Sequence, residues 1–363
     1  MRIEVDGVQY ADFAAASVVS RLDALSNTFA FEATSEEARP LPFLGGEACS
    51  VWVDGEKVLT GSIELVNVSG DKESHKIDIQ GMDKTGDLLY SSIGSISDFR
   101  PPMTLKKAIE RIISHLGASI FVVDLVSPDS FNSAEDLAAP EPGQNAFEFI
   151  EILARKRQVL LTSDEEGNVV ITSSHGEVVG ATLQHRVDDN SNNVLSYAVS
   201  YDSTGRFNAY KSMSQLNPTP LVLAGGTGVD AIVDQQSKIV VDQQIRAGRQ
   251  FILVAESMYS SAEGEKRILW ERNVRRARGR VYSATVHGHR NQTGNLWRIN
   301  EVVLVADEYA GVEASMLVNS VTYGVDEDEG TYTALSLVEK NAYSIAAAEP
   351  QEVEEKMGDG LFG

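Results

Sequence analysis

Apolar and polar residues alternate through most of the first hundred positions, which is typical of β-strands that bury one face. Turns are expected at Asp54–Gly55 and in the polar run of residues 69–74, each between two alternating segments. Together these elements predict a small barrel or sandwich over residues 1–98. The pair Pro101–Pro102 ends the pattern, because proline has no backbone N–H to donate within a sheet.

The middle segment, residues 99–176, changes to the spacing of amphipathic helices. Its first helix has apolar residues every three or four positions, with Thr104 as N-cap and Gly117 as C-terminal stop. Asn145, with Glu148 three positions later, resembles a capping box at the start of a second helix. The predicted elements of this α+β insert are a helix over residues 105–116, a helix over 145–157 and a hairpin over 159–171.

The β pattern resumes at residue 177 and continues almost to the end of the chain. This second β unit contains a long excursion over residues 216–249, where two prolines and the run Gly225–Gly228 favour a loop. Phe251–Val254 is predicted as a short core strand, and the residues from Ser261 to about Arg278 are predicted as a helix.

A weak internal repeat relates the two β units. The first closes on a hairpin around Gly70 and the second on a hairpin around Asp326–Gly330, each with an acidic turn that contains glycine. Residues 343–363 are acidic and poor in large apolar side chains, which predicts a flexible tail. The expected fold is mainly β, with the α+β insert between β units over residues 1–98 and 177–342.

The net charge of −22 argues against capture of nucleic acid, because phosphate binding needs clustered Lys and Arg. A surface that repels DNA would suit the wall of a DNA passage. A net charge that only keeps the protein soluble explains the composition equally well. No apolar run approaches the roughly 20 residues that span a bilayer, and no secretory pattern is present, so we expect synthesis in the cytoplasm. The single cysteine, Cys49, is predicted to be a small buried hydrophobe rather than a nucleophile.

Two glycine-containing runs are candidates for phosphate-binding loops. Gly81–Gly86 contains Lys84 followed by threonine, but it lacks the glycine spacing of a phosphate loop, and an aspartate precedes the lysine. Gly225–Gly228 lacks the strand, helix and distal acidic residue of a dinucleotide site. We therefore expect a strand-ending turn at the first run and a loop at the second.

His287 and His289 would share one face of a strand and could ligate a metal if further ligands were near, but no third ligand is identifiable. A surface or subunit contact is the alternative for this pair. The other histidines, which lack the context of a nucleophilic triad, are His75, His115, His175 and His185. No pair of carboxylates stands out for acid–base work, so we predict no catalytic, cofactor-binding or metal-binding residues.

A basic concentration stands out within this acidic chain. It shares one predicted helix with Trp270 and Val274 and extends just beyond it, and its members are Arg272, Arg275, Arg276, Arg278 and Arg280. One interpretation is a solvated helix face. The sharper interpretation is docking of arginine forks against an acidic neighbouring subunit, with nucleic-acid contact as a third possibility.

The run Gly81–Leu88 resembles the Gly-x-Asp-Lys-Thr-x-Asp-Leu pattern of Mu-like contractile phage baseplate hub proteins. The helix over residues 104–117, the run 155–163, the hairpin at 167–170 and the strand at 251–254 before the arginine-rich helix follow the same order as in that family. The resemblance covers about residues 1–343.

The resemblance implies a non-enzymatic trimer in which residues 1–98 and 177–342 of each chain are tube-like β-barrel units. Its ring would connect the six-fold tail tube to the three-fold central spike and surround the DNA passage, and its partners would be itself, the spike, the tube or tube-initiator proteins and other baseplate proteins. It would be assembled in the host cytoplasm and reside in the virion tail baseplate. Trp270, Trp297 and Arg298 are hypothetical interface anchors.

Two other functions stay open from the sequence. A tail-associated cell-wall-degrading enzyme would need a paired acid–base or metal constellation in a cleft, and none was found. A hub of a phage-related contractile injection system shares every feature above.

Overall fold

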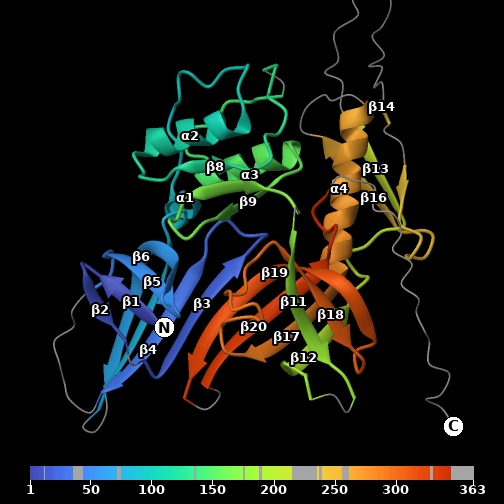
Figure 1. Cartoon of the computed structure of the whole chain (residues 1–363). Coiled ribbons are helices and arrows are strands. Elements are labelled where there is room, and N and C mark those ends of the chain that lie inside the picture. Colours follow the sequence, from blue (N-terminus) through green and yellow to red (C-terminus); the bar gives the residue numbers. More distant parts are fainter. Residues whose placement is uncertain are drawn as a thin grey trace, which may run out of the picture.

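The computed structural model describes residues 1–11, 13–35, 44–71, 75–134, 136–174, 176–187, 190–214, 235–236, 239–255, 261–327 and 330–344. Most of the predicted excursion over residues 216–249, the run 225–228, His175 and the tail beyond Ser344 lie outside these residues. The fold is mostly β with few helices, as predicted (Figure 1). No helix in the described part of the chain is long and apolar enough to cross a membrane.

Within its described residues, the first β unit has seven strands in the sheet order β3-β4-β7-β6-β5-β1-β2, with every neighbouring pair antiparallel. The strands are β1 (Arg2–Val5), β2 (Val8–Tyr10), β3 (Ala15–Arg21), β4 (Thr28–Ser35), β5 (Ala48–Val53), β6 (Glu56–Gly70) and β7 (His75–Asp83). The predicted turn at Asp54–Gly55 joins β5 to β6, and both of its residues have positive φ. Such a turn matches the twist of the strands that it connects.

The insert forms its own core of buried aliphatic and aromatic side chains beside the first β unit. Its elements are α1 (Gly86–Tyr90), α2 (Leu105–Leu116), β8 (Val122–Asp124), α3 (Ala146–Lys156), β9 (Leu160–Ser163) and β10 (Val169–Thr172). Both predicted caps are confirmed: Lys107 N donates to the Thr104 side chain, and Glu148 N donates to the Asn145 side chain. The core of the insert also includes Leu88, although the first β unit was predicted to extend to residue 98.

The second β unit has the sheet order β12-β17-β20-β19-β18-β11. Its strands are β11 (Glu177–His185), β12 (Val194–Tyr201), β17 (Arg280–His287), β18 (Glu301–Asp307), β19 (Val312–Asp326) and β20 (Gly330–Glu339). All pairs are antiparallel except β11 with β18.

Between β12 and β17 in the chain, the described residues form a four-stranded sheet and the arginine-rich helix. They are β13 (Ala209–Ser214), β14 (Gln235–Gln236), β15 (Val240–Val241), β16 (Gln250–Ala255) and α4 (Ser261–Gly279). The helix lies along β13 and β16 (Figure 1). The strand predicted at 251–254 is confirmed within β16, but it is not a core strand: Phe251 and Leu253 pack toward the helix, while Ile252 and Val254 are exposed. A strand with only one covered face alternates in this way.

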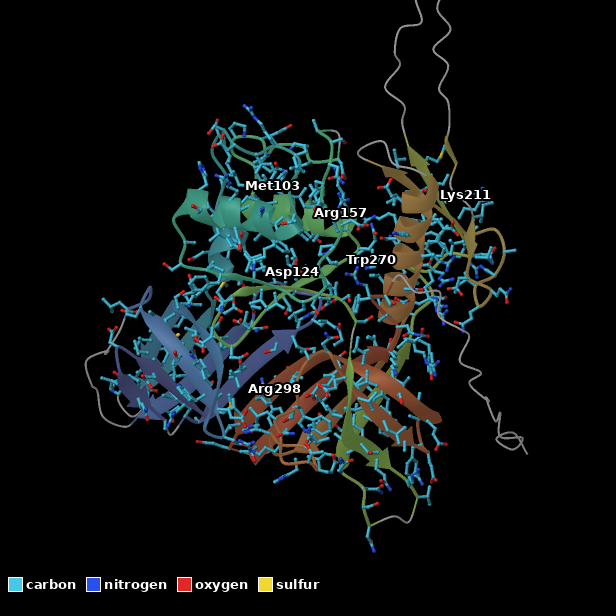
Figure 2. All side chains as sticks on the ribbon, turned by 45° about the horizontal axis from the view of Figure 1, so that its top comes forward. Met103, Asp124, Arg157, Lys211, Trp270 and Arg298 are labelled. Atoms are coloured by element: carbon cyan, nitrogen blue, oxygen red, sulfur yellow. The ribbon has the colours of Figure 1, made fainter. Side chains whose placement is uncertain are left out.

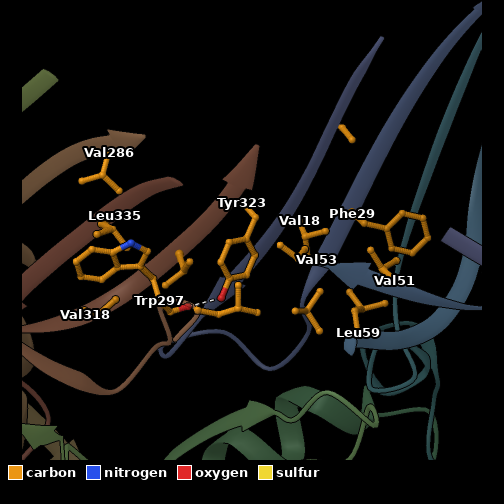
Figure 3. Close-up of a cluster of buried hydrophobic side chains, with 14 of the residues drawn as sticks. Val18, Phe29, Val51, Val53, Leu59, Val286, Trp297, Val318, Tyr323 and Leu335 are labelled. Carbon is orange, nitrogen blue, oxygen red and sulfur yellow. Dashed lines mark hydrogen bonds between the residues drawn. The ribbon is translucent and has the colours of Figure 1, made fainter. Parts of the chain in front are cut away.

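One sheet, with 13 strands in the part of the chain that the structure describes, runs through both β units, because β3 pairs antiparallel with the second half of β19. A single hydrophobic core follows the sheet from one unit into the other. In Figure 3, Val18 of the first unit lies beside Tyr323 of the second, with Phe29 on the far side of Val18. The Tyr323 hydroxyl donates to the Trp297 carbonyl. The two β units are therefore packed as one body.

Candidate functional site

The two β units are built from the same arrangement of five strands. In order along the chain, the equivalent pairs are β3 and β12, β4 and β17, β5 and β18, β6 and β19, and β7 and β20. β6 and β19 are both 15 residues long, and each carries an irregularity near its middle, after Ile63 and after Val318 respectively. The hairpins on which the internal repeat rested therefore occupy equivalent places.

The joint between the units is a ladder of seven residue pairs, from Arg21 opposite Ser320 to Ala15 opposite Asp326. At its centre Val18 lies opposite Tyr323, and both side chains are buried, with exposed fractions of 0% and 4%. The first half of β19 pairs with β18, so the joint uses only the second half of that long strand.

Two strand segments equivalent to the partners in this joint lack a second neighbour among the described residues. The second half of β6, from Leu65 to Gly70, pairs with β7 alone, and β12 pairs with β17 alone. Residues 67–70 of β6 are all exposed, and so are most residues of β12. Exposed strand edges of this kind are sites at which another strand can add by backbone hydrogen bonds.

A polar contact joins the Asp54–Gly55 turn of the first unit to the second unit. His289 is buried, with Nδ1 3.1 Å from Asp54 Oδ1 and Nε2 3.0 Å from the Gly324 carbonyl oxygen. Arg290 and Arg298 both donate to Glu56, at 2.8 and 3.1 Å.

The predicted sharing of one face by the two histidines was therefore wrong. β17 ends at His287, which is exposed, and Gly288 has a φ of 73°, which turns His289 into the core. Within the described ranges, no group of three or more His, Cys, Asp or Glu is placed to hold a metal.

The Gly-x-Asp-Lys-Thr run positions a buried carboxylate between the first β unit and the insert. Asp83 accepts from Asn27 N at 2.7 Å, Ser26 Oγ at 3.0 Å, Thr85 N at 3.0 Å and Thr85 Oγ1 at 2.5 Å. The hydroxyl of Ser163, at the end of β9 in the insert, also donates to it. Burial raises the pKa of Asp83, and these hydrogen bonds act against that rise. The run therefore connects the first β unit to the insert. The residue that precedes Lys84 is Asp83, whose carboxylate accepts all of these hydrogen bonds.

The β9–β10 turn of the insert also docks on β6. Thr60 Oγ1 donates to the Glu165 carbonyl at 2.8 Å, and Lys57 forms an ion pair with Glu166 at 2.5 Å. At Gly167, with a φ of 72°, a Cβ atom would lie 2.5 Å from the Thr60 carbonyl oxygen, so only glycine fits. Nothing in the local sequence pattern indicated these contacts.

The arginines of α4 mostly serve contacts within the chain. Arg275 forms an ion pair with Glu271 at 2.8 Å, and its guanidinium lies over the rings of Phe207 and Phe251. Arg276 lies 3.2 Å from Glu339 on β20. Burial lowers the pKa of Arg272, and Arg280 lies over the ring of Tyr201. Of the five arginines only Arg278 is exposed, so the interpretation of this cluster as a solvated helix face was wrong.

Two of the three predicted interface anchors are core residues. Trp270 of α4, labelled in Figure 2, belongs to an apolar cluster that includes buried residues of the main sheet. Trp297 is buried to an exposed fraction of 1%. Arg298 is on the surface, with its side chain about half exposed. Cys49 is buried as predicted, and burial raises the pKa of its thiol to about 12.

Three successive segments of the chain match known domain families. Residues 1–83 match the N-terminal domain of proteins like the Mu phage baseplate assembly protein GpP. Residues 85–173 match the second domain of proteins like the baseplate hub protein gp44, and residues 260–346 match the fourth domain of GpP.

Whole proteins also align with nearly the full chain. It is 23% identical to baseplate hub protein gp44 of Escherichia phage Mu, over 99% of this chain and 93% of that protein. The 43 kDa tail protein of prophage MuSo2 from Shewanella oneidensis superimposes with a TM-score of 0.81 at 28% identity, over 94% of this chain and 99% of that one. A type VI secretion component of E. coli, described as similar to the T4 tail proteins gp27 and gp5, shares the fold, with a TM-score of 0.55 at 13% identity over 93% and 77%.

Proposed function

The chain is a baseplate hub protein of the Mu-like phage tail, and from this premise we propose that three copies form a ring between the six-fold tail tube and the three-fold central spike. The ring surrounds the DNA passage and has no enzymatic activity. Its place is the tail baseplate of the virion, and it assembles in the host cytoplasm.

The repeated β unit is the observation that carries this proposal. Each chain contributes two arrangements of five strands with the same order, so a ring of three chains presents six similar units on one side. Six units suit contact with a six-fold tube, while three chains suit contact with a three-fold spike. The mismatch in symmetry is then resolved within one chain rather than by an adaptor protein.

Charge supports the proposed passage. The net charge of −22 disfavours adhesion of DNA to the protein, because phosphates and acidic side chains are both negative and repel each other. The descriptions of the relatives as baseplate hub and tail proteins support a structural role. The proposed partners are the chain itself, the spike, the tube or its initiator, and other baseplate proteins.

Light scattering coupled to size exclusion, near physiological salt and over a range of concentrations, tests the ring. The expected mass is three times the 39.4 kDa of the chain, and electron microscopy of that fraction is expected to show a ring with a central opening. A mass that stays at one chain, with and without the spike protein added, would reject the proposal.

The likeness in fold to a type VI secretion component favours one second candidate, the hub of a phage-related contractile injection system. Both candidates share the ring and differ in what the tube delivers. Isolation of assembled particles distinguishes them, since a phage particle carries a DNA-filled head and an injection system does not.

A further inference from the structure

We propose that residues 345–363, which follow the last described residue, Ser344, dock within the same chain on the sheet formed by β13, β14, β15 and β16 (the small sheet). The docking site is the face of the small sheet that α4 leaves uncovered, here called the outer face. This contact lies within one chain, so it does not depend on the proposed ring.

The helix α4 covers one face of the small sheet (Figure 1). On that face, Tyr210, Phe251 and Leu253 pack in one apolar cluster with Ile268 of the helix. Because successive side chains of a strand alternate, the residues between these positions lie on the outer face. With the residues beside the buried Val240, the strand register gives the members of the outer face as Lys211, Met213, Ile239, Val241, Ile252 and Val254.

Large aliphatic side chains dominate the outer face. Ile239, Val241, Ile252 and Val254 are each between 47% and 55% exposed. Scattered exposed apolar residues are ordinary, but a group of them on neighbouring strands marks a surface that another segment covers. The outer face therefore has the character of a docking surface.

The charge around this apolar group is opposite to that of the chain. The chain has a net charge of −22, yet the described residues 239–255 and β13 together carry three cations, Lys211, Arg246 and Arg249, and one acid, Asp242. Asp242 is buried and accepts from Arg206 at 2.7 Å. The outer face and its margin therefore attract an acidic occupant.

Residues 345–363 have the composition that this surface selects. They contain five acidic residues and one lysine, and their large apolar residues are Ile345, Val353, Met357, Leu361 and Phe362. Their apolar side chains can cover the aliphatic group while their carboxylates meet Lys211 and the two arginines.

The segment is also long enough to reach the outer face. It continues from Ser344, whose carbonyl oxygen accepts from the Asn273 side chain of α4 at 2.7 Å. The residues from there to Leu361 can extend to roughly 55 Å, whereas the 19 residues of α4 make a helix of about 28 Å. Because the segment is tethered, its effective concentration at the outer face is high, and a weak contact is enough to hold it there.

Cysteine cross-linking in the whole chain tests the docking. With Ile252→Cys and Phe362→Cys, a short bismaleimide is expected to link the two positions within one chain, which mass spectrometry of the digested monomer band identifies. The matched control carries Val178→Cys and Phe362→Cys, because Val178 is also exposed but belongs to β11 of the main sheet. The first pair should link about tenfold faster, since docking raises the local concentration of position 362 at the small sheet. The buried thiol of Cys49 adds little background, and circular dichroism establishes that the variants fold.

Charge reversal in the same cysteine pair tests the basic margin. Lys211→Glu with Arg246→Glu should slow the link between positions 252 and 362 several-fold, and raised salt should do so in the parent pair. Lys107→Glu with Arg111→Glu is the matched control: it makes the same change of charge on the exposed face of α2 and should leave the rate unchanged.

Each outcome gives a decision. A faster link at the small sheet, slowed only by the reversals there, supports the docking. Equal rates for the two cysteine pairs, or equal effects of the two charge reversals, overturn it. A product that contains two linked chains on the denaturing gel overturns the assignment of the occupant to the same chain.

Discussion

Replacement of Asp83 tests whether the Gly-x-Asp-Lys-Thr run acts as the joint between the first β unit and the insert. The carboxylate accepts hydrogen bonds from two backbone N–H groups, those of Asn27 and Thr85, and from three hydroxyl groups. In Asp83→Ala the backbone N–H groups of Asn27 and Thr85, which are buried, lose the carboxylate as acceptor. The hydroxyls lose less, because that of Thr85 can still donate to the Leu25 carbonyl, 3.2 Å away.

The magnitude follows from the two backbone groups. A buried donor left without a partner costs about 1–3 kcal/mol, so Asp83→Ala should lower the free energy of unfolding by about 2–6 kcal/mol. Asp83→Asn keeps one acceptor oxygen and should lose about half as much. Asp87→Asn is the matched control, since this aspartate belongs to the same run but is exposed, and it should stay within about 0.5 kcal/mol of the parent.

Urea unfolding followed by tryptophan fluorescence measures these differences. The midpoint for Asp83→Ala is expected to fall by about 1–2 M urea.

The pH dependence of the free energy of unfolding adds a second readout. Because burial raises the pKa of Asp83 above the ordinary value of an aspartate, the folded parent binds more protons than the unfolded chain between those two pKa values. Parent stability relative to Asp83→Asn should therefore fall as pH rises through this window. Equal midpoints for Asp83→Ala and Asp87→Asn would refute the joint.

Three further predictions concern packing. Arg275→Ala should increase protease cleavage in β13 and β16, because the Glu271 ion pair and the stacking on Phe207 and Phe251 are lost, whereas Arg278→Ala should leave cleavage unchanged. Gly61→Ala should abolish soluble expression, since a Cβ there would lie 1.9 Å from the Met82 carbonyl oxygen, while Gly205→Ala, with open space around it, should express normally. Cys49 should react with a thiol reagent at pH 8 only after unfolding in urea, because burial raises the pKa of its thiol to about 12; rapid reaction in the native state would contradict this.

Local signals were sufficient for the helices of the insert. The side chains of Thr104 and Asn145 each accept a hydrogen bond from the backbone N–H three residues later, and Gly117 adopts the left-handed conformation at the end of α2. Such signals depend on neighbours in sequence, so they can be recognised without knowledge of the fold. The hairpins around Gly55 and around Gly167 were predicted for the same reason.

Contacts between distant segments could not be predicted in this way. The choice of β19 as the neighbour of β3 depends on packing in three dimensions, because many alternating segments could have paired there. The face of His289 was misjudged because the strand was assumed to continue, although Gly288 was a visible signal for its end. The burial of Trp297 and the contacts of Arg275 likewise depend on which elements come together, not on the pattern of the residues themselves.

The pairing of β3 with β19 also determines when the edge of the first β unit is covered during synthesis of the chain. Arg21 and its partner Ser320 are separated by almost the whole chain, so the ribosome completes the first β unit long before the strand that covers its edge exists. At about 5–20 residues per second, this edge stays open for roughly 15–60 s. During that time it can pair with a strand from another nascent chain on the same messenger. Slow synthesis or crowded polysomes should therefore favour domain-swapped products, and chaperones that shield strand edges should suppress them.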